Sequence, residues 1–352
     1  MPQHHHDVLR NLKARRYICA IMLTAFIRFG DGRYSTDSDR KSIENALRDP
    51  KALFWVDMTD PSAEELTLLD EVFGFHPLAI EDTIQHVQRP KIENYCQTGD
   101  ACKEGYFYMV IHGPDLETFR HRLRTKELDM FVSERYLVTI HDDRSMTIDE
   151  LATRGKADPR VILDPGIDVL LYNLIDKVVD HYLPIFDHLQ EEIDSLEDEA
   201  LADPHPAVLT QIAQQKRDLL NLRRVIGPQR EVLAQLTRGE VPFIRETTRI
   251  YFRDVQDHLN RAVETIELYR DLISGARDIY LSSISNNLNR IMKALTIITV
   301  IALPLNIITG FFGMNFHAMP GLDSPRAFWI TVAIMIAAVT TMLMLFRKKR
   351  WL

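Results

Sequence analysis

Two long apolar segments near the end of the chain constrain the fold more than any other feature. The first runs from Met292 to Phe312, and the second runs from Ala327 to Phe346 without a charged residue. A helix rises about 1.5 Å per residue, so each segment is long enough to cross a hydrocarbon core of about 30 Å. The alternative is a buried helical hairpin, but the second segment is longer and more uniformly apolar than an ordinary core helix. The sequence therefore predicts two transmembrane helices.

The charges that flank these segments predict how they are oriented. Four basic residues, Arg347–Arg350, follow the second segment, and Arg290 and Lys293 lie at the start of the first. The connecting loop, Gly313–Arg326, carries a positive charge only at its last residue. Because cytoplasmic flanks are enriched in Lys and Arg, we expect both chain ends in the cytoplasm. The start of the chain shows no apolar run with a cleavage site, so we expect no signal peptide.

The charge, cysteine and histidine content limits which partners and metal ions the chain is expected to bind. Acidic residues outnumber basic ones by 50 to 42, which argues against nucleic acid and is compatible with divalent cations. The three cysteines, Cys19, Cys96 and Cys102, are scattered, so we expect free thiols. The run His4-His5-His6 is interpreted as a polar tail, with weak binding of a soft metal as the alternative.

Residues 1–165 alternate short strand-like and helical patterns, which predicts a cytoplasmic α/β domain. The expected strands are Ile18–Phe29, Ala52–Met58, Tyr106–His112 and Met130–Ile140. Ser62, followed three residues later by a glutamate, predicts the start of a helix. We find no glycine-rich phosphate loop, nucleophile elbow or catalytic carboxylate pair, so we do not expect an enzyme.

Residues 166–290 change to long helical patterns, which predict a stalk that leads into the membrane part, residues 291–352. Asp168–Ala202 and Ala207–Thr237 are expected to form an antiparallel pair, followed by one helix over Ile244–Phe312 that is about 100 Å long if continuous. This last helix carries apolar residues at alternating spacings of four and three, which indicates packing against other long helices. They are Val255, Leu259, Ala262, Ile266, Tyr269, Ile273, Ala276 and Tyr280.

A second face of the same helix continues from the cytoplasm into the membrane and contains polar residues. It comprises Asp278, Leu281, Ser285, Asn289, Met292, Leu295, Thr299, Leu303, Asn306 and Gly310. Polar groups within a bilayer turn towards protein or water rather than lipid. One pair of spans cannot cover such a face, so we expect several copies around an axis. The alternative is a polar helix interface with no lumen.

The end of the first span carries a motif that resembles a known family. Phe312 is followed by Gly313, Met314 and Asn315, and the chain is similar to the CorA family of divalent-cation channels, the two-transmembrane type with a Gly-Met-Asn signature. The family has Tyr where this chain has Phe312. The stretches His76–Tyr95 and Tyr251–Val255 also match, and the resemblance extends over nearly all of the chain from about Val56.

The resemblance implies an α+β membrane protein that assembles as a homopentamer in the inner (plasma) membrane. The cytoplasmic α/β domain and the long helices would form a funnel, and the first spans would line the pore. Gly313, Met314 and Asn315 would form the selectivity filter, where amide carbonyls bind a hydrated ion weakly enough to release it. The pore and gate would be lined by Asn289, Met292, Leu295, Thr299, Leu303, Asn306 and Gly310.

The resemblance also implies regulation by cytoplasmic Mg²⁺ bound between subunits. Asp82 would face Asp254, with Glu81 and Asp176 as weaker candidates. Outside the membrane, the family's acid in the loop after the signature is replaced by Gly321, and Asp323 is the residue expected to attract cations. This change, with a histidine in the same loop, leaves the preferred ion open among Mg²⁺, Co²⁺, Ni²⁺ and Zn²⁺.

Three candidate functions follow from these features. The first is a passive channel for Mg²⁺, and also for Co²⁺ and Ni²⁺, driven by the membrane potential and closed by cytoplasmic Mg²⁺. The second is a zinc transporter of the same superfamily, with proton coupling left open. The third is a membrane-anchored sensor or enzyme, which the lack of a catalytic constellation disfavours.

Overall fold

A computed structural model describes residues 22–85, 88–95, 105–116, 118, 123–314 and 325–351. The chain forms two compact units. The first contains the residues up to Ser195 together with Gln211–Ser274, and the second contains Leu196–Thr210 and Gly275–Leu352. The division at residues 165 and 290 that the sequence pattern suggests stays a prediction.

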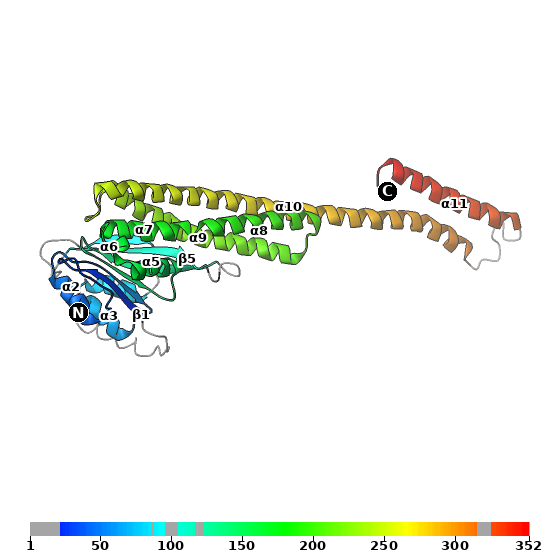
Figure 1. Ribbon diagram of the computed structural model, residues 1–352. Helices are drawn as coiled ribbons and strands as arrows, with labels where there is room; N and C mark the ends of the chain where they lie inside the picture. Colours follow the sequence, from blue (N-terminus) through cyan, green and yellow to red (C-terminus); the bar gives the residue numbers. More distant parts are fainter. Residues whose placement is uncertain are drawn as a thin grey trace. The chain divides into compact units, whose positions relative to one another are not determined.

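A seven-stranded sheet forms the centre of the first unit (Figure 1). Its order is β2-β1-β3-β7-β6-β5-β4, and only β3 and β7 pair in parallel. The strands are β1 (Met22–Arg28), β2 (Tyr34–Ser35), β3 (Leu53–Thr59), β4 (Lys91–Asn94), β5 (Phe107–Pro114), β6 (Thr125–Val132) and β7 (Tyr136–His141). Strands β3, β5 and β7 are mostly apolar and largely buried, as expected for strands that are covered on both faces.

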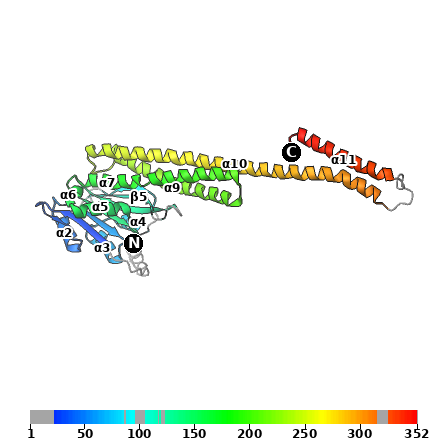
Figure 2. The same ribbon diagram turned by 45° about the vertical axis from the view of Figure 1, so that its right-hand side comes forward.

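Helices cover both faces of this sheet (Figure 2). One face carries α2 (Arg40–Arg48), α3 (Ala63–Glu71) and α4 (Pro77–Gln85), and the other carries α5 (Met146–Ala157), α6 (Pro159–Leu163) and α7 (Ile167–Asp180). The predicted start of α3 is confirmed, because Ser62 and Glu65 form a reciprocal capping box. The predicted α/β domain is therefore confirmed.

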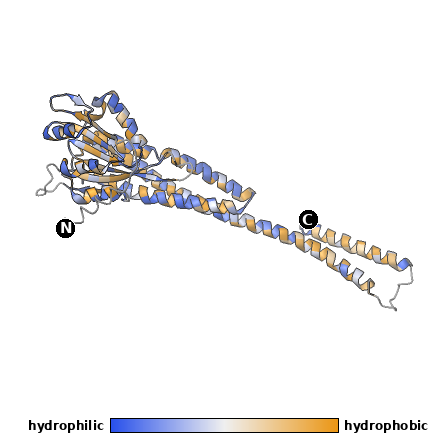
Figure 3. Cartoon of the chain, turned by 90° about the horizontal axis from the view of Figure 1, so that it is seen from below, coloured by the Kyte–Doolittle hydropathy of each residue, from blue (hydrophilic) through white to orange (hydrophobic). Residues whose placement is uncertain are grey.

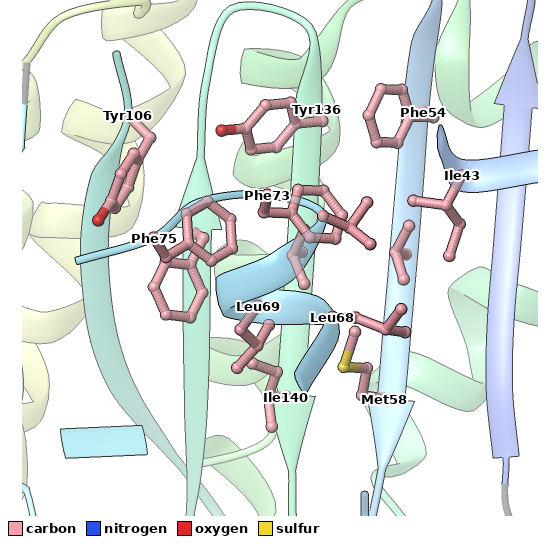
Figure 4. Packing of buried hydrophobic residues seen from close by; sticks show 14 of the residues in the cluster. Ile43, Phe54, Met58, Leu68, Leu69, Phe73, Phe75, Tyr106, Tyr136 and Ile140 are labelled. Atoms are coloured by element: carbon pink, nitrogen blue, oxygen red, sulfur yellow. The ribbon is translucent and has the colours of Figure 1, made fainter. Parts of the chain in front are cut away.

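The core between α2–α4 and the sheet is rich in aromatic rings (Figure 4). Phe75 stacks on Phe131 with ring centroids 4.1 Å apart and contacts Phe73 at 5.0 Å. Tyr106 and Tyr136 lie within reach of the same ring. Stacked and tilted aromatic pairs contribute beyond their buried area, so this cluster fixes the segment that leads into α4.

One predicted strand and one predicted helix are each divided into two elements in the structure. Met130–Ile140 is not one strand, because Ser133 Oγ accepts hydrogen bonds from the backbone N–H groups of Arg135 and Tyr136 and closes a hairpin between β6 and β7. The predicted helix Asp168–Ala202 divides after Asp180 into α7 and α8 (Leu183–Ala202). The break falls at the buried Tyr182, whose hydroxyl donates to the carbonyl of His112.

The long helices agree with the predicted pattern. They are α8, α9 (Pro206–Arg238) and α10 (Glu246–Phe312), and α10 is continuous over 67 residues. All eight apolar positions predicted on its packing face, from Val255 to Tyr280, are buried. Within the first unit, Tyr269 of α10 donates to the carbonyl of Phe186 in α8, and Arg223 of α9 pairs with Glu267 of α10.

The start of α10 is held to α7 by a buried carboxylate. Asp168, 5% exposed, accepts hydrogen bonds from the backbone and guanidinium of Arg245 and from Thr248 Oγ1. Burial alone raises the pKa of Asp168, but these hydrogen bonds lower it overall. A side chain at Gly166, where φ is +109°, would meet the same guanidinium at 2.7 Å, so the turn before α7 requires glycine.

We therefore expect Asp168→Asn to destabilise the first unit by about 2 kcal/mol, because a charge-assisted network loses its acceptor charge. Chemical denaturation of the purified chain at neutral pH measures this change. The matched control is Asp164→Asn, since the side chain of Asp164 is 45% exposed and pairs with Arg28 at the surface. Equal effects of the two substitutions would contradict this role of Asp168.

The second unit contains the apolar helices. Both the end of α10 and α11 (Pro325–Lys348) are long and apolar enough to cross a membrane. Figure 3 colours α11 and the last part of α10 as predominantly hydrophobic. Large side chains such as Leu303, Ile307 and Trp329 are more than half exposed. The two predicted spans are confirmed as helices of the expected length.

Candidate ion pathway and regulatory site

The apolar half of α10 is hardly covered by the described residues. Between Leu281 and Met314, Ile297 is the single buried residue in this fully described range. All seven residues predicted to line a pore, from Asn289 to Gly310, are exposed. Such a surface must be covered by lipid on one side, and its polar side must face water or other protein.

Polar groups on the predicted pore face behave in two ways. Thr299 Oγ1 donates to the carbonyl of Leu295 in its own helix, which satisfies the hydroxyl locally. The side-chain amides of Asn289 and Asn306 make no hydrogen bond with any described residue. An unpaired amide at membrane depth is costly, so Asn306 is the side chain that most needs an aqueous or protein surrounding, while Asn289 lies three residues before the apolar segment begins.

The predicted filter lies directly after α10. The N–H of Gly313 donates to the carbonyl of Thr309, which continues the helical pattern by one residue. A Cβ at Gly313 would lie 3.0 Å from that carbonyl oxygen, so the chain approaches itself closely at this position. Met314 is exposed. Asn315 and Asp323 lie outside the described residues.

The predicted regulatory acids occur in two groups on the first unit. Asp254 on α10 is 67% exposed and lies 3.9 Å from His258, which in turn lies 4.0 Å from Asp180 on α7. Burial, reinforced by repulsion from Asp180, raises the pKa of the nearby Asp176. Asp180 and His258 were not among the predicted residues, although each lies four residues after a predicted acid, a spacing that aligns side chains on a helix.

The second group surrounds Asp82 on α4. Asp82 Oδ2 lies 2.5 Å from Lys91 Nζ, and the same ammonium lies 2.9 Å from Glu93 Oε1. Glu81 accepts a hydrogen bond from Gln85 on its own helix. No set of three His, Cys, Asp or Glu residues among those described is arranged to hold a metal within one chain.

Two further acids, the buried Asp129 and the half-buried Glu127, lie near α4. Glu127 and Asp129 point to the same face of β6, and each has one carboxylate oxygen without a hydrogen-bond partner among the described residues. Tyr108 donates to the other oxygen of Asp129, and the N–H of Gln88 donates to Glu127. Burial raises the pKa of Glu127 to about 7, and burial with repulsion from Glu127 raises the pKa of Asp129.

This burial predicts a pH dependence. Because the pKa of Glu127 is higher in the folded chain than in the unfolded chain, its contribution to the free energy of unfolding is present at low pH and lost as pH rises through about 7. We expect Glu127→Gln to raise Tm at pH 8 by roughly 2–4 °C relative to the unmodified chain, and to change it little at pH 5. Thermal unfolding at both pH values measures this difference.

Glu134→Gln is the matched control, since Glu134 is exposed in the turn between β6 and β7. It should leave Tm unchanged at both pH values. A Glu127→Gln variant whose Tm follows that of the unmodified chain from pH 5 to 8 would show that Glu127 does not titrate in this range.

Comparison with known proteins shows which family the chain resembles. The sequence profile described as CorA-like Mg2+ transporter protein matches residues 50–348. The cobalt/magnesium transport protein CorA of Thermotoga maritima is 35% identical over 313 residues, which cover 88% of this chain and 87% of that protein. The zinc transport protein ZntB of Pectobacterium carotovorum is 24% identical over 63% of this chain and 67% of its own length. The solved CorA magnesium transporter of Methanocaldococcus jannaschii superposes with a TM-score of 0.76 at 26% identity, covering 95% of this chain and all of that one.

Proposed function

Since this chain belongs to the CorA-like Mg²⁺ transporter family, we propose that it forms a homopentameric channel that conducts Mg²⁺, and also Co²⁺ and Ni²⁺, into the cytoplasm. Membership makes it a membrane transporter of divalent cations and not an enzyme. The observation that carries the proposal is the exposed, partly polar face of α10 from Asn289 to Gly310. Copies arranged around an axis would cover this face and leave a water-filled path along it.

The proposed path has an outer binding site, an acidic residue that attracts cations to it, and an apolar constriction. Asn315, at the outer end, binds the hydrated ion through amide oxygens, and Asp323 raises the local cation concentration. Met292 and Leu295 form an apolar constriction that can close by excluding water. With an inside-negative potential, each elementary charge gains about 2.3 kcal/mol per 100 mV on entry, so no other energy source is needed.

We further propose that both chain ends lie in the cytoplasm and that cytoplasmic Mg²⁺ closes the channel. Asp254 of one subunit and Asp82 of the next would share the ion, with Glu81 and Asp176 close by. Carboxylate oxygens are the ligands that Mg²⁺ prefers, and two acids brought together at an interface repel unless a cation lies between them. Loss of the ion would loosen the ring and favour the open state.

Ion flux into liposomes tests the proposed function. Purified chain in sealed vesicles should admit Mg²⁺ and Co²⁺ down their gradients, at a rate that a proton gradient does not change. The zinc alternative, which the relationship to ZntB supports, predicts Zn²⁺ uptake that responds to the proton gradient. Vesicles that stay impermeable to every divalent cation would overturn both.

A further inference from the structure

Lys91 forms an ion pair with Asp82, the carboxylate that is proposed to bind the regulatory divalent ion. It is the first residue of β4, and its Nζ lies 2.5 Å from Asp82 Oδ2 and 2.9 Å from Glu93 Oε1. The ammonium also lies 5.4 Å from the centre of the Tyr108 ring, within the range of a cation–π contact. Three favourable contacts therefore hold one cation against Asp82.

The surroundings keep this cation in place. The side chains of Lys91 and Asp82 are only 24% and 25% exposed. The ammonium is thus held between two carboxylates rather than free in solvent.

A divalent ion at Asp82 would have to share the carboxylate with this ammonium or displace it. Sharing brings three positive charges together, and displacement breaks a partly buried ion pair. Both lower the affinity of Asp82 for the ion. The purely structural reading is that Lys91 only neutralises buried acids. That reading predicts loss of stability when Lys91 is removed, but no gain in affinity for Mg²⁺.

We propose that Lys91 is a built-in competitor for Asp82, which raises the concentration of Mg²⁺ at which the regulatory site fills. This inference rests on the proposed regulation through Asp82 and Asp254. Removal of the Lys91 side chain is therefore expected to strengthen regulation by Mg²⁺ rather than weaken it.

Protection from protease tests the inference without relying on transport. The full-length chain in detergent is digested over a series of Mg²⁺ concentrations, and the midpoint of protection is measured. We expect Lys91→Met to lower this midpoint about tenfold, which corresponds to about 1.4 kcal/mol. The Mg²⁺ concentration for half-inhibition of uptake into liposomes should shift in the same direction.

Four further variants separate charge at Asp82 from other effects. Lys91→Arg keeps the cation and should keep the midpoint. Arg89→Met removes an equal charge two residues earlier, from an exposed side chain that forms no ion pair with any described residue, and should also keep it. Asp82→Asn should abolish protection by Mg²⁺. Glu93→Gln removes one of the contacts that hold the ammonium against Asp82 and should lower the midpoint, whereas a general loss of negative charge near the site would raise it.

The possible results are distinct. A Lys91→Met variant that folds and keeps or raises the midpoint, while Asp82→Asn loses protection, overturns the role of Lys91 alone. If Lys91→Met does not fold, an unchanged or raised midpoint for Glu93→Gln overturns it instead. Absence of any protection by Mg²⁺ in the unmodified chain overturns the proposed regulation, and this inference with it.

Discussion

Replacement of Asn315 by alanine is expected to reduce Mg²⁺ uptake into liposomes by about a hundredfold, equivalent to a barrier higher by about 2.7 kcal/mol. In a ring of subunits the substitution removes every amide oxygen of the proposed outer site at once. Mg²⁺ keeps its first-shell waters tightly, so an entry site must bind those waters through oxygen acceptors, and a methyl group offers none. Initial rates of uptake at fixed membrane potential measure the effect.

The control for this variant is Thr340→Ala in α11, where the exposed hydroxyl only bonds to the carbonyl of Ile336 in its own helix. It should conduct at the unmodified rate, since the helix keeps all of its backbone hydrogen bonds. Asn315→Ala should still assemble and unfold like the unmodified chain, because the change lies beyond the end of α10. Uptake within threefold of the unmodified rate would remove Asn315 from the pathway.

The periodic features of this chain were predictable from its sequence. The spacing of Val255, Leu259 and their successors predicted the buried face of α10, and every one of those positions is buried. The apolar lengths predicted two spanning helices, and Ser62 with Glu65 predicted the start of α3. These signals are local, because a helix or strand repeats its surroundings at a fixed period along the chain.

Features that depend on contacts between distant segments were missed. The boundary between β6 and β7 lies in the polar turn Ser133–Arg135, which strand propensity alone overlooked. The pairing of Lys91 with Asp82 joins a strand to a helix, and the approach of His258 to Asp180 joins two helices. No periodicity encodes which of several nearby charges will meet. For the same reason the number of subunits cannot be obtained from one chain.

The second large effect is expected at the proposed regulatory site. Asp254→Lys should raise the Mg²⁺ concentration for half-inhibition of uptake by at least about tenfold, because the substitution replaces a carboxylate ligand by a cation that repels Mg²⁺. The fold should tolerate the change. Asp254 is 67% exposed, and the new ammonium would lie on the same helix face as His258, which is within 4.0 Å of Asp180. Uptake at low cytoplasmic Mg²⁺ should therefore remain intact.

Asp271→Lys is the matched control, because it makes the same change of charge on an exposed residue of the same helix, about 25 Å along its axis. A general effect of surface potential on cation entry would shift inhibition in both variants, and it would weaken at high ionic strength. Loss of a bound ion would shift inhibition in Asp254→Lys alone, and high salt would not restore it. Unchanged inhibition in Asp254→Lys would exclude Asp254 from the regulatory site. Asp82, with Lys91 bound to it, would then lack the partner that regulation between subunits requires.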